Sequence, residues 1–253
     1  MTLPLDFVLS DFVDRSFRDI ADEEYIAARI QYRCQLIFPC SWSAHQALEK
    51  YLKAILLYNR KKTNSIRHDI GTALQHVKDI ADLQFSIPDE VEDFISYVNK
   101  QGTNRYFTSR FHFIEGFLLQ LDSCVWHIRK YCMNYHYPEC KFDFLVADND
   151  YRKIIEDLSK VNPEKHATKF GLHHGLLERI ISDTSGYWRT TYEGLVWKNF
   201  YYGKRRKKAV QRFRFTVGAG SPTHYNLEDV YDTLKEYVYF EKKVRDDFSA
   251  GND

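Results

Sequence analysis

The chain has 253 residues and a mass of 30.1 kDa, which is larger than one average domain and small for two. Hydrophobic residues make up 44% of it and aromatic residues 16%, which excludes a generally disordered chain. The 11 glycines and 6 prolines are too few for the tight turns of a β-sandwich or barrel. With 36 basic and 35 acidic residues the net charge is +1, which by itself indicates no charged partner.

We expect neither a membrane-spanning segment nor a location in an oxidising compartment. No apolar run approaches the roughly 20 residues of a membrane span, and residues 1–6 have neither a basic nor an apolar region typical of a secretory leader. The five cysteines are odd in number and include no CxxC motif. We therefore expect free thiols, a soluble cytoplasmic protein and no membrane partner.

The first 135 residues have the apolar periodicity of helices. Helices are expected at about residues 22–35, 44–56, 69–80, 88–98 and 111–132. Pro39 is expected to close the first helical segment, and Asp69 to cap the third. Short polar connections between four or five helices predict a bundle over residues 1–138.

The second region, residues 139–253, is less regular. Helical patterns occur at 151–158, 170–181 and 227–244, and residues 212–217 alternate as in a short β-strand before a turn at Gly218. The predicted fold class is therefore all-α: a four- to five-helix bundle, then a mainly helical region with at most one short β element.

Three short motifs occur in order along the bundle. They are residues 44–54 (AHQALEKYLKA), residues 67–70 (RHDI) and residues 104–106 (NRY). In order and spacing they resemble the HEPN family of nucleotide- and RNA-associated helical domains, over about residues 15–135. The resemblance implies a helical bundle that is often dimeric. It also implies one of two roles: metal-independent RNA cleavage marked by an R-x4-6-H motif, or non-catalytic nucleotide binding and association with a nucleotidyltransferase.

Arg105 and His112 fit the spacing of that motif. Cleavage of RNA without a metal needs a base for the ribose 2′-hydroxyl, which a histidine supplies, and a cation for the phosphate, which an arginine supplies. If both lay on one helix they would be about 10 Å apart, so a loop at Arg105 or a dimer partner would have to close the gap. Arg110 is an alternative cation.

Two observations weaken this assignment. Tyr106 follows the arginine where cleaving members often have a polar residue, and the same spacing recurs at Arg129 and His136. In the alternative interpretation, Arg105 is a structural or phosphate-binding residue.

Other polar residues have two interpretations each. His68 and Asp69 form either an acid–base pair or a helix cap, and the cap is favoured. Gln46, Glu49 and Lys50 line either a groove between helices or a solvated face. A zinc site built from the cysteines and histidines of residues 124–140 is disfavoured by their spacing, so we predict no metal and no cofactor.

A basic segment between residues 198 and 214 contains no acidic residue. Its eight cations are Lys198, Lys204, Arg205, Arg206, Lys207, Lys208, Arg212 and Arg214. Five aromatic residues interleave with them or directly follow the last: Phe200, Tyr201, Tyr202, Phe213 and Phe215. They would bind a nucleic-acid backbone and stack on its bases, or form a solvated loop whose aromatic residues pack inward.

The preferred prediction is an RNA- or nucleotide-binding protein that cleaves RNA without a metal ion in a defence or toxin-type system, with Arg105 and His112 as catalytic residues. The alternative is a non-catalytic module that forms a homodimer or binds a nucleotidyltransferase partner.

Overall fold

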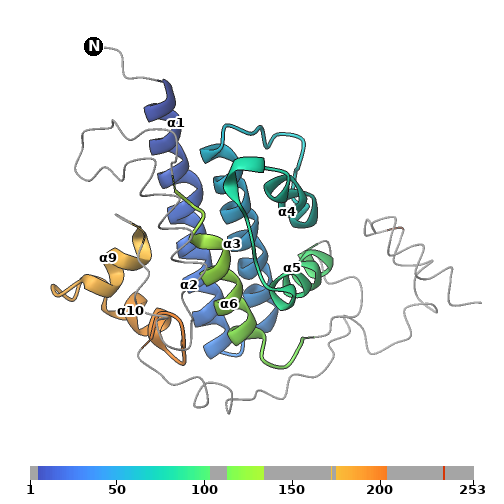
Figure 1. Ribbon diagram of the computed structural model, residues 1–253. Helices are drawn as coiled ribbons and strands as arrows, with labels where there is room; N and C mark the ends of the chain where they lie inside the picture. Colours follow the sequence, from blue (N-terminus) through green and yellow to red (C-terminus); the bar gives the residue numbers. More distant parts are fainter. Residues whose placement is uncertain (1–4, 103–112, 134–171, 173–174, 204–235, 237–253) are drawn as a thin grey trace, which may run out of the picture.

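The computed structural model describes residues 5–102, 113–133, 172, 175–203 and 236. Their secondary structure is helical, with no strand among them, which confirms the all-α prediction. The elements are α1 (Leu5–Val13), the π-helical η1 (Asp14–Arg18), α2 (Asp19–Arg33), α3 (Ile37–Tyr58), α4 (Ile70–Lys78), the 3-10 turn η2 (Ala81–Leu83), α5 (Asp89–Gly102), α6 (Phe117–Arg129), α9 (Leu176–Ser182) and α10 (Arg189–Val196) (Figure 1). The predicted strand at 212–217 and the predicted helices at 151–158 and 227–244 lie outside the described residues.

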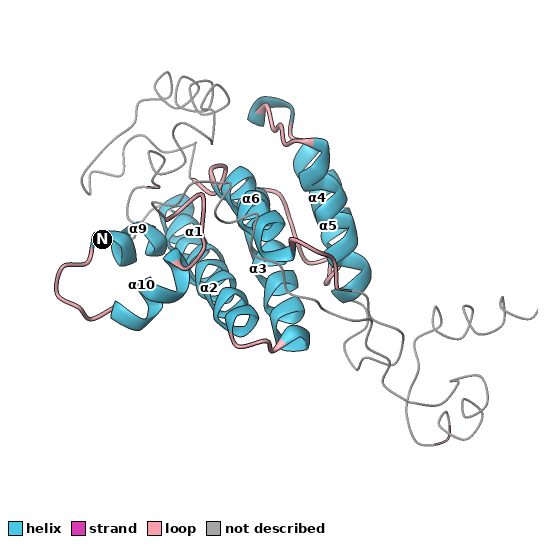
Figure 2. Ribbon diagram, turned by 90° about the horizontal axis from the view of Figure 1, so that it is seen from below, coloured by secondary structure: helices cyan, strands magenta, loops and turns pink. Residues whose placement is uncertain are grey.

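Helices α2 and α3 form the centre of the bundle. Helices α1, η1 and α2 follow one another without a break, because the backbone stays right-handed at Val13 and Asp19. Helix α6 lies against α5, α3 and α2, and α4 lies against α3 and α5 (Figure 2). Helices α9 and α10 lie on the opposite side of α2 and so extend the bundle (Figure 2).

The strongest predicted helix, at 44–56, is confirmed as part of the 22-residue α3. Its residues are buried on several sides because α3 contacts helices on both flanks. The role predicted for Pro39 is wrong: α2 ends at Arg33, and Pro39 lies in the first turn of α3. A proline is tolerated there because N–H groups in the first turn form no hydrogen bond within the helix.

The predicted helix from residue 111 begins later, at Phe117. Gly116, the residue before it, has a left-handed backbone (φ 75°), which interrupts the helical path. Helices α1 and α10 and the π-helical segment η1 were not predicted. In place of the helix expected at 170–181, the described structure has α9, which begins at Leu176.

Most cysteines of the described chain belong to the core. Cys40, Cys124 and Cys132 are buried free thiols, and Cys34 is an exposed free thiol. Burial raises the pKa of the three buried thiols. Within the described residues, no helix combines the length and apolar character that crossing a membrane requires.

Candidate functional site

The two predicted catalytic residues, Arg105 and His112, lie outside the described residues, as do the cations of the basic segment from residue 204 to 214. The described chain ends on either side of the catalytic pair at Gly102 and Phe113. Both ends are closely packed. A Cβ added to Gly102 would lie 1.9 Å from Cδ2 of His45 on α3, and the Phe113 ring lies 4.3 Å from that of Phe117.

Phe113 also contacts the ring of Tyr32 on α2, with 5.9 Å between centroids. The described chain therefore lies beside α3 at Gly102, before this segment, and beside α2 at Phe113, after it. Helix α6 begins at Phe117, five positions after His112, and residues 113–116 between them are not helical.

The aromatic residues at the start of the basic segment are not available for stacking on bases. Phe200, Tyr201 and Tyr202 are buried, with 6 to 7% of their surface exposed. The Tyr201 ring lies 5.7 Å from Trp126 and the Tyr202 ring 6.0 Å from Tyr25. For these three residues the interpretation in which the aromatic side chains pack inward is confirmed.

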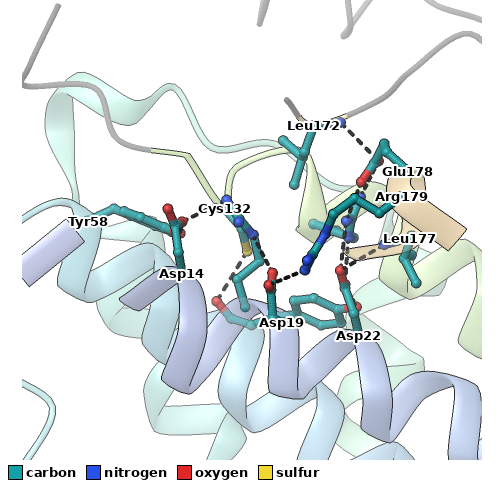
Figure 3. Close-up of polar contacts among 12 residues, drawn as sticks. Asp14, Asp19, Asp22, Tyr58, Cys132, Leu172, Leu177, Glu178 and Arg179 are labelled. Atoms are coloured by element: carbon teal, nitrogen blue, oxygen red, sulfur yellow. Dashed lines mark hydrogen bonds and ion pairs between the residues drawn. The ribbon is translucent and has the colours of Figure 1, made fainter. Parts of the chain in front are cut away.

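A buried ionic cluster joins α6, α2 and α9 (Figure 3). Arg129, fully buried, donates to both oxygens of Asp22 at 2.7 and 2.8 Å and to both oxygens of Glu178 at 2.6 and 2.7 Å. At the solvent side, Arg179 of α9 pairs with Asp19 of α2 at 2.7 Å. Four of the five guanidinium N–H groups of Arg129 are thus engaged, which leaves this arginine unsuited to binding phosphate.

A second buried cluster joins α2, α6 and α10. Arg29 pairs with Asp122 and donates to the backbone oxygens of Gly194 and Trp197. Tyr25 donates to Asp122 at 2.7 Å. Burial raises the pKa of Asp122, and the charge of Arg29 opposes that rise. Because Arg29 and Arg129, the arginines at the centre of the two clusters, are fully buried, we assign both clusters to the architecture: they hold α9 and α10 on the bundle.

A third polar cluster reaches the surface, between α3 and the start of α4. The buried carboxylate of Glu49 accepts from Nζ of Lys53 at 2.6 Å and faces Nδ1 of His68 at 3.1 and 3.2 Å. Burial would raise the pKa of Glu49, but the hydrogen bonds from Lys53 and His68 and their charges lower it overall. Glu49 is therefore ionised, and 56% of the His68 side chain is exposed beside it.

The backbone on both sides of His68 is fixed. Arg67 has a left-handed backbone (φ 51°), and its carbonyl oxygen accepts from Lys53. Asp69 caps α4, as predicted, by accepting from the backbone N–H groups of Gly71 and Thr72 at 2.9 and 3.0 Å. The cluster is thus an exposed imidazole held in one place by a buried carboxylate, an arrangement suited to contacting a ligand.

Asn99 of α5 tightens this arrangement. Its amide oxygen accepts from the N–H of Ile70 at 3.1 Å, and its amide nitrogen donates to Asp69 at 3.0 Å.

Sequence reasoning missed the pairing of His68 with Glu49. It considered Asp69 as the acidic partner of His68, whereas Asp69 faces the helix it caps. The available signal was that Glu49 and His68 belong to two of the three motifs behind the family resemblance. Gln46 and Lys50, which the sequence analysis grouped with Glu49, form a separate contact: Lys50 donates to Gln46 at 3.0 Å and to Glu24 of α2 at 3.4 Å.

Comparison with known protein families matches residues 15–161 to the family described as HEPN domain. The match covers more than half of the chain, and the chain therefore belongs to this family, as its motifs indicated. Membership supports a nucleotide- or RNA-related function. No curated protein and no solved structure matches the chain. The family match ends before α9, so the helices that the two buried clusters attach to the bundle lie beyond it.

Proposed function

We propose that the protein binds RNA and cleaves it without a metal ion, with His112 and Arg105 as the catalytic residues. His112 takes the proton from a ribose 2′-hydroxyl, whose oxygen attacks the adjacent phosphorus. Arg105 stabilises the charge that develops on the phosphate. The bond from phosphorus to the 5′-oxygen breaks, and this oxygen takes up a proton from water. The products are a 2′,3′-cyclic phosphate and a 5′-hydroxyl, and His112 returns its proton to the solvent.

The observation that supports this proposal is the position of the chain on either side of the pair. Gly102 packs against His45, one helical turn from Glu49, and Nδ1 of His45 is 3.9 Å from the Glu49 carboxylate. Gly102, the last described residue before the segment with the pair, therefore lies close to the exposed polar cluster. The basic segment of residues 204–214 would hold the RNA backbone.

The alternative function, a non-catalytic interaction module, is favoured by a different surface. Leu36, Phe38 and Trp42, at the turn into α3, are 53%, 40% and 37% exposed. Adjacent large apolar side chains on a surface are typical of protein–protein contacts. In this alternative the protein forms a homodimer or binds a nucleotidyltransferase through this surface.

Cleavage of labelled single-stranded RNA in EDTA tests the proposal. The full chain is compared with the Arg105→Ala, His112→Ala double variant and with a matched Arg189→Ala, His76→Ala double variant, which removes an exposed arginine and an exposed histidine elsewhere. We expect cyclic-phosphate products from the parent and the control only. Equal cleavage by all three would refute the assigned residues. Binding of RNA without cleavage by any of them would support the module instead.

A further inference from the structure

The loop between α3 and α4 is an exposed basic surface. Residues 59–68 (NRKKTNSIRH) contain four Lys or Arg residues, one histidine and no acid. Lys61, Lys62, Arg67 and His68 are exposed. Arg60 has a structural role instead, since its guanidinium donates to backbone oxygens at the end of α3.

The loop is held in a defined shape. Ile66 is buried and anchors it to the core. Two consecutive turns compact it: the N–H of Ile66 donates to the carbonyl of Thr63, and the N–H of Asp69 donates to the carbonyl of Ile66, both at 3.2 Å. A fixed loop loses little conformational entropy when it binds a ligand.

His68 presents one defined ring nitrogen to a ligand. An ionised carboxylate only accepts hydrogen bonds, so Nδ1 of His68, which faces Glu49, carries a hydrogen. Nε2 remains, and it has no hydrogen-bond partner in the described part of the chain. It can donate to a phosphate oxygen when the ring is protonated, or accept from a ribose hydroxyl when the ring is neutral.

The cations of the loop are not neutralised locally. Within the described residues the guanidinium of Arg67 has no ionic or hydrogen-bonding partner, and the nearby Glu49 carboxylate is already paired with Lys53 at 2.6 Å. A guanidinium binds phosphate through two parallel N–H groups, which an exposed arginine next to a fixed imidazole can offer to one nucleotide.

We propose that Arg67 and His68 bind a nucleotide unit of single-stranded RNA, with Lys61 and Lys62 attracting the neighbouring phosphates and Glu49 as a positioning residue for His68. The residues of this site are different from Arg105 and His112, the proposed catalytic pair. It deepens the proposed function by naming where an RNA strand contacts the bundle, and it rests on that function.

Binding of a short labelled single-stranded RNA, measured by fluorescence anisotropy over a range of salt concentrations, tests the site. To prevent cleavage, all chains carry the Arg105→Ala, His112→Ala substitutions. Arg67→Ala is compared with Arg189→Ala, and His68→Gln with His76→Gln, each control being an exposed residue of the same type. We expect Arg67→Ala to raise Kd about tenfold and to make the log–log salt dependence shallower by about 0.7.

Glu49→Gln separates positioning from a purely structural effect. In the chain that otherwise carries only Arg105→Ala, His112→Ala, Glu49→Gln should weaken RNA binding. In the chain that also carries His68→Gln, it should cause no further loss of RNA affinity. The helical circular dichroism should be unchanged in both. Equal additional losses in both backgrounds would contradict the positioning role.

Three results would overturn the proposal in distinguishable ways. If the parent binds RNA but Arg67→Ala and Arg189→Ala have the same Kd and salt dependence, this site is wrong and the proposed function stands. If the parent binds no RNA, both are wrong. If free adenosine monophosphate displaces the labelled RNA as effectively as unlabelled RNA does, the site binds mononucleotides, and the assignment to an RNA strand is wrong.

Discussion

Replacing Asp22 by asparagine tests how the buried ions of Figure 3 join α9 to the bundle. The substitution preserves the size of the side chain and one acceptor oxygen for Tyr51, which donates to Asp22 at 2.6 Å. It removes the negative charge that faces Arg129 over two hydrogen bonds of 2.7 and 2.8 Å. What remains is a guanidinium with a single anionic partner, Glu178.

The expected loss follows from burial. The side chains of Asp22 and Arg129 are both 0% exposed, so water cannot replace the missing charge. Removing one partner of a buried pair costs about 3–5 kcal/mol in the free energy of unfolding. For a chain of this size that corresponds to a fall in Tm of roughly 6–20 °C. Glu178→Gln should cost less, about 1.5–3 kcal/mol, because the Glu178 side chain is 22% exposed.

Urea unfolding of the full chain, followed by circular dichroism, measures both losses. Asp11→Asn is the matched control, because its pair with Arg15 is exposed, at 46% and 77%, and should contribute less than about 1 kcal/mol. The Asp22→Asn, Glu178→Gln double variant should depart from additivity, because both carboxylates share Arg129. If Asp22→Asn loses no more than Asp11→Asn, the cluster does not hold α9 on the bundle as argued.

Two further predictions concern pH and close packing. Burial would raise the pKa of Glu178, but the charge and hydrogen bonds of Arg129 lower it overall. Ionised Glu178 therefore contributes to the free energy of unfolding above pH 4.3, about the pKa of an unfolded glutamate. This contribution is lost as the pH falls toward the lower pKa of the folded protein. The urea midpoints of the parent and Glu178→Gln should therefore converge below about pH 4.3, and parallel midpoints down to pH 3 would contradict this. Gly102→Ala should destabilise the chain by about 1–3 kcal/mol, because the new Cβ would lie 1.9 Å from His45 Cδ2. Thermal unfolding should show that His45→Ala relieves part of this loss, whereas fully additive losses would exclude a clash between the two.

The helices that could be predicted are those in which apolar residues recur at helical spacing or a capping residue marks the start. Helix α3 repeats apolar residues at every third or fourth position over six turns. Helix α4 follows Asp69, whose carboxylate accepts from the free N–H groups of the first turn. Helices α1 and α10, with 9 and 8 residues, offer few repeats of the pattern and were missed. Helix α4 also has only 9 residues, but the cap at Asp69 marked its start.

The buried charges could not be predicted. Asp22, Arg29 and Arg129 have the residue types of a surface, and charged residues are rarely fully buried unless they are paired. Their partners are distant in the sequence: 107 positions separate Asp22 from Arg129, and 93 separate Arg29 from Asp122. Sequence patterns relate residues a few positions apart, so they cannot predict ion pairs between residues this far apart.

The amino-acid sequence by itself determined the helical class and, through three short motifs, the HEPN family, because helical periodicity and a motif are properties of neighbouring residues. Only the tertiary structure decided which charged groups are buried together. It also decided that His68 is exposed while its ring contacts the buried carboxylate of Glu49. The physical reason is that the electrostatic environment of a side chain depends on the helices packed around it, and these come from distant parts of the chain.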